Sequence, residues 1–319
     1  MKRRDLIAGL LCLPFATPAW AAAKQISILH SGFPDRTPIH VLIEALRALG
    51  YENGNTAMME LLGAEGDAKR LDTLVAGLAS KKPDVIIALT SPAALALKQA
   101  AVVTPVVFAF VTDPVGLGIV ASLAHPGGNF TGITYSEATL GGKRLDLLLD
   151  ALPGTRRVAV IWSRSFSENA AIYDAIRQAA RARGVEVFSK ELEGAQDLAP
   201  AFDSAKGSGA QALVFITDNV MFGRRKEIAA LALSRQLPSI HSFAPEVEDG
   251  GLLSYGPDLG ENYRRTAALA DRVLKGARPA DLPVEEPTQF SLYINLRTAK
   301  ALGLEIPSML LARADQVIE

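Results

Sequence analysis

Cysteine is almost absent from this sequence: its 319 residues contain one, Cys12, close to the N-terminus. A disulfide bond needs two cysteines, and thiolate metal sites and cysteine nucleophiles need this side chain in the folded protein. Residues 1–23 have the pattern of a removable export signal, as described below. Once they are removed no cysteine remains, so disulfides, thiolate metal sites and cysteine nucleophiles are excluded.

An excess of charge of either sign is also missing. Lysine and arginine total 33, aspartate and glutamate total 34, and the formal net charge is −1. Proteins that bind nucleic acids carry a basic surplus, so the charge gives no indication of a nucleic-acid partner. The apolar content of 49% is typical of a globular chain, and the length favours two domains or two lobes of one fold.

The sequence also lacks the short motifs of several enzyme classes. It has no G-x-S-x-G nucleophile turn and no G-x-x-x-x-G-K-[ST] phosphate loop. The glycine-rich stretch that begins at Gly116 lacks the third glycine of a dinucleotide-binding fingerprint. Four histidines occur without the spacing of a metal site: His30, His40, His125 and His241. We therefore expect neither a metal nor a cofactor.

The N-terminus has the order of an export signal. Lys2, Arg3 and Arg4 form a basic start, which is followed by an apolar stretch too short to span a bilayer and by small residues. We predict a signal peptide at 1–23, cleaved after Ala21 or Ala23, and export to the periplasm by the Sec route or, because two arginines are adjacent, by the twin-arginine route. Cleavage removes three basic residues and one acidic residue, so the formal charge becomes −3.

Apolar runs rich in β-branched residues alternate with stretches of helical period. In the first half, strands are predicted at 25–31, 56–66, 83–90 and 104–110, and helices at 38–50, 67–82 and 91–101. This order indicates right-handed crossovers and a parallel sheet that is covered on both faces. The apolar stretch from Val85 to Val111 has the length of a membrane helix, but Pro92, Lys98 and Pro105 interrupt it, so we place it in a core.

The same pattern recurs after a break at 134–156. Strands are predicted at 157–162, 185–192, 211–216 and 237–243, with helices at 167–184, 197–209 and 224–236. A late strand, a helix at 259–275 and a further strand and helix at 289–303 imply that the chain returns between the lobes. We predict an α/β fold of two doubly wound parallel-sheet lobes joined by a hinge of three parallel segments. The predicted lobes are 24–134 plus 257–289 and 135–256 plus 290–319.

Polar residues follow the predicted strands of the first lobe, and ligands bind at this edge of open α/β sheets. A helix N-terminus there suits a carboxylate, and Asp113 suits an ammonium or hydroxyl group. The alternative is that Ser91 and Asp113 are only N-caps, each with proline following. The candidate residues of the first lobe are Gly32, Phe33, Pro34, Thr90, Ser91, Pro92, Asp113 and Pro114.

The corresponding positions of the second lobe are Trp162, Ser163, Asp218 and Asn219. Aromatic residues are few, yet several fall near these edges, where they can form a stacking platform for a ligand. Lobe packing is the alternative, and we prefer it for Phe222 and Phe243. The other aromatic residues near these edges are Phe33, Tyr135, Trp162 and Tyr255.

Five segments carry a resemblance to a known family: "PDVIIALTSPAALALKQA", "TPVVFAFVTDPVGLGIVASLAHPGGNFTGIT", "KRLDLLLDALP", "GGLLSYGPDL" and "INLRTAKALGLEIPSMLLARADQVIE". They closely resemble the ABC-transporter substrate-binding proteins of the tryptophan/tyrosine-binding type, over nearly all of the chain after residue 23. The resemblance implies a type I periplasmic-binding-protein fold with a three-segment hinge. It also implies a monomer that captures a small solute for an inner-membrane permease and its ATPase.

By position, the resemblance implies a ligand site in the loops that hold Gly32, Phe33, Pro34, Thr90, Ser91, Pro92, Asp113, Pro114, Thr134, Tyr135, Asp218, Asn219 and Tyr255. One departure is visible. Relatives show Asn-Pro after the first strand of the second lobe, where this chain has Ser163 and Arg164. An exposed Arg164 is the simpler interpretation, and contact with an extra ligand carboxylate is the alternative.

The leading hypothesis is a periplasmic solute-binding protein without catalytic residues, which closes its lobes on an amino acid or aromatic carboxylate. One alternative is a sensor subunit that presents its ligand to a membrane receptor. Another is an enzyme that uses Asp113 and Asp218 as acid and base. The sequence does not name the solute, since a sugar or nucleoside would also use aromatic rings and aspartate.

Overall fold

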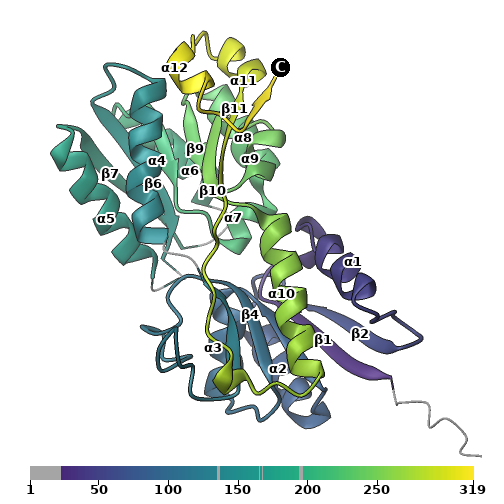
Figure 1. Cartoon of the computed structure of the whole chain (residues 1–319). Helices are drawn as coiled ribbons and strands as arrows, with labels where there is room; N and C mark the ends of the chain where they lie inside the picture. The colour runs from purple at the N-terminus through teal and green to yellow at the C-terminus, as the bar shows by residue number, and fades with distance from the viewer. Residues whose placement is uncertain (1–22, 135–136, 165, 167, 194–196) are drawn as a thin grey trace, which may run out of the picture.

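The structure is a computed structural model that describes residues 23–134, 137–164, 166, 168–193 and 197–319. Figure 1 shows two lobes, one built on the first five strands and one on the later strands. Residues 1–22 of the predicted signal peptide and Tyr135 lie outside the described residues. Within the described part of the chain, no helix has the length and apolarity needed to cross a membrane.

The first lobe contains a parallel sheet in the order β2-β1-β3-β4-β5. Its central strand β3 is buried along its whole length, as expected for a short apolar run in a doubly covered sheet. The strands are β1 (Lys24–His30), β2 (Ala57–Gly63), β3 (Val85–Leu89), β4 (Val106–Val111) and β5 (Phe130–Thr134).

Helices cover both faces of this sheet. On one face, α1 (His40–Ala48) and α10 (Leu259–Leu274) pack against β1, β3 and β4. On the other, α2 (Ala68–Lys81) and α3 (Ser91–Gln99) pack against the alternate side chains of the same strands. The 3-10 turns η1 (Pro34–Arg36) and η3 (Pro279–Asp281) complete the lobe. The late helix α10 therefore belongs with the first lobe, although it follows most of the second in sequence (Figure 1).

The second lobe contains a seven-stranded sheet in the order β12-β11-β10-β9-β8-β6-β7. Its neighbouring strands are parallel except for β10 and β11, which pair in antiparallel fashion. The strands are β6 (Arg157–Ser163), β7 (Glu186–Leu192), β8 (Ala212–Phe215), β9 (Ser239–His241), β10 (Leu253–Pro257), β11 (Phe290–Asn295) and β12 (Gln316–Ile318).

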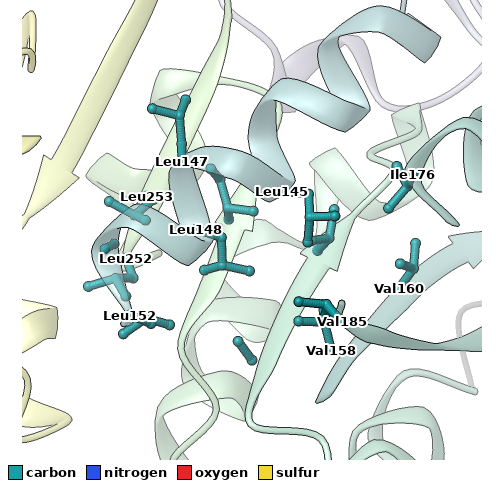
Figure 2. Close-up of a cluster of buried hydrophobic side chains, with 14 of the residues drawn as sticks. Leu145, Leu147, Leu148, Leu152, Val158, Val160, Ile176, Val185, Leu252 and Leu253 are labelled. Carbon is teal, nitrogen blue, oxygen red and sulfur yellow. The ribbon is translucent and has the colours of Figure 1, made fainter. Parts of the chain in front are cut away.

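The helices of the second lobe also lie on both faces. One face is covered by α4 (Glu137–Ala151) and α5 (Asn169–Ala182), and Figure 2 shows the leucines of α4 beside Val158, Leu252 and Leu253. The opposite face packs against α6 (Leu198–Gly207) and α8 (Arg225–Ser234). The remaining helices are α7 (Asn219–Gly223), α9 (Ala244–Glu248), α11 (Leu296–Ala301) and α12 (Ser308–Leu311).

Three connections join the lobes: from β5 to α4, from β10 to α10, and from the segment that follows η3 to β11. Glu285 pairs with Ile133 in the first lobe, and the chain enters the second sheet at Phe290. The prediction of three crossings is confirmed. The prediction that the hinge segments are parallel is wrong, because β10 leaves the second lobe where β11 enters it and the two strands run in opposite directions. The exact lobe boundaries stay a prediction.

The break predicted at 134–156 is wrong, because it contains the 15-residue helix α4. The adjacent Gly141 and Gly142 weaken the helical signal there. Their reason is packing: a Cβ atom on Gly141 would lie 2.8 Å from Ile176 Cγ1 of α5. The predicted cap of α3 is displaced by one residue, since Thr90 rather than Ser91 is the N-cap, and a turn rather than a helix follows Asp113.

Candidate ligand-binding site

Two adjacent cavities lie between the lobes. The inner cavity, of about 90 Å³, is lined by residues from the carboxyl ends of both sheets and from α10. The outer cavity, of about 810 Å³, is lined by η1, the start of α2 and the region of α7 and α8. Phe166, Asp218 and Asn219 line both, so these residues separate the two spaces.

The first lobe presents three strand ends to the inner cavity: His30 at the end of β1, Thr90 and Ser91 after β3, and Phe110 and Thr112 in and after β4. Thr90 has φ 129° and Phe110 has φ 59°. Positive φ is strained for a β-branched or bulky residue, and such strain concentrates at functional sites. The strained backbone therefore coincides with the cavity wall.

Aromatic rings form much of the apolar lining. Phe110 and Tyr263 meet edge to face with centroids 5.1 Å apart, and Phe222 and Phe243 do so at 5.8 Å. The two pairs come from opposite lobes, and all four residues line the inner cavity together with Phe166. Edge-to-face and stacked rings are the surfaces that recognise flat apolar or aromatic groups.

Asp218 is the most perturbed acid of the site. Its Oδ1 accepts hydrogen bonds from the N–H groups of Val220 and Met221, both over 2.8 Å, and so caps α7. Its Oδ2 is buried and has no hydrogen-bond partner in the described part of the chain. Burial raises the pKa of Asp218 to about 6, although the two N–H donors and the Ser163 hydroxyl favour the charged form and the nearby charge of Glu246 opposes it.

His30 is a neutral donor. The N–H of Gly32 donates to its Nδ1 over 2.8 Å, so the ring proton resides on Nε2. Burial lowers the pKa of His30 to about 4, and the Gly32 hydrogen bond and Asp35 only partly oppose this shift. At neutral pH, His30 therefore offers the inner cavity a hydrogen-bond donor without a charge.

Several contacts join the lobes around the outer cavity. Asn219 Nδ2 donates to Ser31 Oγ over 2.8 Å, and Ser31 Oγ lies 2.7 Å from Thr90 Oγ1. The Arg225 guanidinium donates to the carbonyl of Arg36 over 2.8 Å and lies 4.8 Å from the ring of Phe222. The lobes are thus in direct polar contact beside the outer cavity.

A buried ion pair lies beside the inner cavity. The guanidinium of Arg144 contacts both carboxylate oxygens of Glu137, and the two side chains are 1% and 4% exposed. Arg144 Nε also donates to the carbonyl of Tyr255 over 2.7 Å, and the Ser242 hydroxyl donates to Glu137 over 3.2 Å. Helix α4 is thereby tied to the hinge strand β10.

The structure brings some predicted residues together. Thr90, Ser91, Asp218 and Asn219 line the inner cavity, whereas Phe33, Pro92 and Ser163 line the outer one. Gly32 lines neither cavity but lies against Asn219, where a Cβ atom would come within 2.7 Å of Nδ2.

Other predicted residues point elsewhere. Trp162 donates to Ser189 and stacks on Tyr173, and Tyr255 stacks on Phe290. The exposed Asp113 accepts a hydrogen bond from its own turn, at Gly116 N over 2.8 Å, so the structure does not direct its carboxylate toward Asp218. None of Pro34, Asp113, Pro114, Thr134, Trp162 and Tyr255 lines either cavity.

Arg164 is 64% exposed and pairs with Glu191, which supports the simpler interpretation of this residue. Other residues that line the inner cavity were not predicted from the sequence, because no local pattern separates a cavity-facing ring from a core ring. These residues are His30, Phe110, Glu137, Phe166, Glu168, Asn169, Phe222, Phe243 and Tyr263. Phe222 and Phe243 had a positional signal, since they follow strand ends. The described residues include no cluster of side chains able to hold a metal ion.

The comparisons with known proteins agree with this architecture. A family model described as ABC transporter substrate binding protein matches residues 35–318. The tyrosine-binding protein of Clostridioides difficile (strain R20291) is 28% identical over 263 residues, which cover 82% of this chain and 75% of that protein.

Two solved structures are similar in fold and sequence. An ABC domain in complex with L-Trp from Streptococcus pneumonia superposes with a TM-score of 0.86 at 26% identity, covering 93% of this chain and all of that one. The ligand-free, open structure of a substrate binding protein from Clostridium difficile gives 0.66 at 25% identity, covering 93% and 99%. Because the family model spans most of the sequence, the chain belongs to the family of ABC transporter substrate-binding proteins.

Proposed function

We propose that this protein is the periplasmic component of an ABC importer and that it closes its two lobes on an aromatic amino acid. The inner cavity carries the proposal: five aromatic rings from both lobes line it together with the buried carboxylate of Asp218. The aromatic side chain would lie among the rings, and the polar end would lie near Asp218, His30 and the start of α3. Export through a signal peptide at 1–23, a monomeric state and delivery to an inner-membrane permease with its ATPase are parts of the same proposal.

The relatives support both the ligand class and the closed arrangement. One is named for tyrosine, and another was solved with L-Trp. At nearly equal identity, the chain superposes better on the L-Trp complex than on the ligand-free, open structure. Contacts between the lobes, such as that from Asn219 to Ser31, are those of a closed form.

A thermal-shift screen of residues 24–319 tests the proposal. L-tyrosine and L-tryptophan should raise the unfolding midpoint by mass action, whereas sugars and nucleosides should not. Phe243→Ala should reduce the shift, because it removes a ring of the inner cavity. Phe188→Ala is the matched control, since this partly buried ring lies on β7 and lines neither cavity. A shift produced by sugars alone would contradict the proposal.

A further inference from the structure

The inner cavity has an unbalanced set of charged side chains. Three of its lining residues are acids, Glu137, Glu168 and Asp218, and none of its described lining residues is lysine or arginine. Glu137 is neutralised by Arg144, which contacts both of its oxygens. His30 is the one histidine of the lining, and its buried ring is neutral. The described lining of the inner cavity therefore carries acidic side chains without a lysine or arginine, whereas the basic residues Arg36, Arg224, Arg225 and Lys226 line the outer cavity.

Asp218 is the acid whose surroundings point most clearly to a ligand. It is 9% exposed and lines both cavities, and its Oδ2 has no hydrogen-bond partner in the described part of the chain. No basic side chain is among the groups that act on its pKa. The hydrogen-bond donors that act on Asp218 are all neutral: the N–H groups of Val220 and Met221 and the Ser163 hydroxyl. A buried carboxylate is normally balanced by a cation, so this site is suited to a cation supplied by the ligand.

The side-chain donors available for a ligand carboxylate in the inner cavity are neutral: His30 Nε2 and the hydroxyls of Ser91, Thr90 and Thr112. The hydroxyls of Thr90 and Ser91 lie at the start of α3, and Thr90 is already within 2.7 Å of Ser31. Thr112 already donates to Glu168 over 3.4 Å. Hydrogen bonds from neutral donors are weaker than those between charged groups. The ammonium group of an amino acid would therefore be held more strongly, by Asp218, than its carboxylate group, which meets only neutral donors.

On the basis of the proposed function, we propose that the site recognises its solute through a cationic nitrogen bound to Asp218, so that the ligand carboxylate is dispensable. Arylalkylamines are then ligands as well as aromatic amino acids. Aromatic carboxylates without an amine are excluded from the inner cavity, because their charge would lie beside the Asp218 carboxylate and the described lining there includes no lysine or arginine. This narrows the solute class, which the sequence left open between amino acids and aromatic carboxylates.

Calorimetric titration of residues 24–319 at pH 7.5 tests the inference with matched probes. The probes are L-tyrosine and L-tryptophan, the amines tyramine and tryptamine, and the acids 4-hydroxyphenylacetate and indole-3-acetate. Each amine should bind within about tenfold of its amino acid, and each acid should bind at least about 100-fold more weakly. An amine that binds no better than the matching acid overturns the inference, even if the amino acid binds tightly.

Two variants test the role of Asp218. Asp218→Asn retains the capping geometry and removes the charge, so it should weaken amine binding by about 100-fold or more. Asp113→Asn removes the same charge from an exposed residue that lines neither cavity, and it should leave the affinity unchanged. If Asp218→Asn binds amines like the wild type, the inference is wrong. If none of the six probes binds the wild type, the proposed function fails together with the inference.

Discussion

Asn219 Nδ2 donates a hydrogen bond to Ser31 Oγ over 2.8 Å, which joins the loop after β8 to the loop after β1. Gly32 makes this approach feasible, because a Cβ atom there would lie 2.7 Å from Asn219 Nδ2 and 3.3 Å from Asn219 Cβ. The glycine is thus required for close contact between the lobes and not for an unusual backbone angle. This relationship leads to the first prediction.

Gly32→Ala should hinder closure. The added methyl group displaces the Asn219 side chain and breaks its bond to Ser31, which costs the closed form about 1–2 kcal/mol and weakens ligand binding about tenfold. Calorimetry measures the affinity. Gly77→Ala is the control, since nothing lies within 4 Å of a Cβ atom on Gly77. Equal affinities for the two variants would show that the lobes do not meet at Gly32 when ligand is bound.

Asp218→Asn should stabilise the unliganded protein at neutral pH. The folded-state pKa of Asp218, about 6, lies above the ordinary value of 3.8, so its stabilising contribution is complete below pH 3.8 and is lost as the pH rises through 6. At pH 7 the ionised, buried carboxylate therefore costs up to about 3 kcal/mol, and asparagine caps a helix as well as aspartate does.

Thermal unfolding of both proteins measures this effect. The variant should unfold several degrees higher than the wild type at pH 7, and the difference should shrink toward pH 4. A variant that is less stable at pH 7 would mean that Asp218 has a cationic partner in the unliganded protein. Residues that serve ligand binding often lower the stability of a protein. A destabilising Asp218 would therefore fit a role in binding.

Affinity for amines and amino acids should fall as the solution becomes acidic. A cation binds the ionised form of Asp218, so affinity is constant above about pH 6.5 and falls up to tenfold per pH unit below 6. The titratable groups around Asp218 in the inner cavity are His30, Glu137, Glu168 and Tyr263, and Glu246 also acts on it. The charged groups of the outer cavity, which Asp218 also lines, are Asp35, Arg36, Glu65, Asp67, Glu193, Arg224, Arg225, Lys226 and Glu227. Because the pKa of His30 is about 4, its ring stays neutral across this range. Dissociation constants measured from pH 5 to 8 check this, and a flat profile would contradict it.

Much of the fold follows from sequence patterns. The apolar run of β3 and the helical spacing of α2 are local signals, and their predicted limits lie within three residues of the structure. The place of Asp218 at the cavity wall was predictable, because the carboxyl ends of parallel strands share one edge. Asp113 follows β4 in the same way, yet a turn comes after it, and the Gly116 N–H donates a hydrogen bond to its carboxylate. The type of local structure after a strand decides where the side chain points, and the strand pattern does not report it.

The remaining site residues depend on contacts that are distant in sequence. Tyr263 lies on α10, which follows most of the second lobe in sequence but packs against the first. Its apolar spacing predicts a buried ring without indicating which cavity the ring faces. Glu137 is the first residue of α4. This helix was not predicted from the sequence, because two adjacent glycines that pack against α5 weaken the helical pattern. Both residues reach the cavity only because of the hinge crossings.

Arg144→Met should destabilise the protein strongly. It leaves Glu137 buried without its guanidinium partner, and breaking a buried ion pair in this way costs about 3–5 kcal/mol. Arg313→Met is the control, since Arg313 is 48% exposed and its pair with Asp150 lies at the surface, where such pairs contribute about 1 kcal/mol or less. Urea unfolding compares the two. If the two variants lost similar amounts of unfolding free energy, Glu137 would be solvated rather than buried.

The central claim is that the lobes close on a ligand held between them, and an interlobe distance tests it most directly. Residues 24–319 contain no cysteine, so cysteines introduced at Lys69 and Lys226 accept spin labels specifically. Lys226 lines the outer cavity and Lys69 follows Ala68, which lines its opposite side. Electron spin resonance should show the distance between the labels shorten and its distribution narrow when L-tyrosine or L-tryptophan saturates the protein. A distribution that stays unchanged at saturation would contradict the claim.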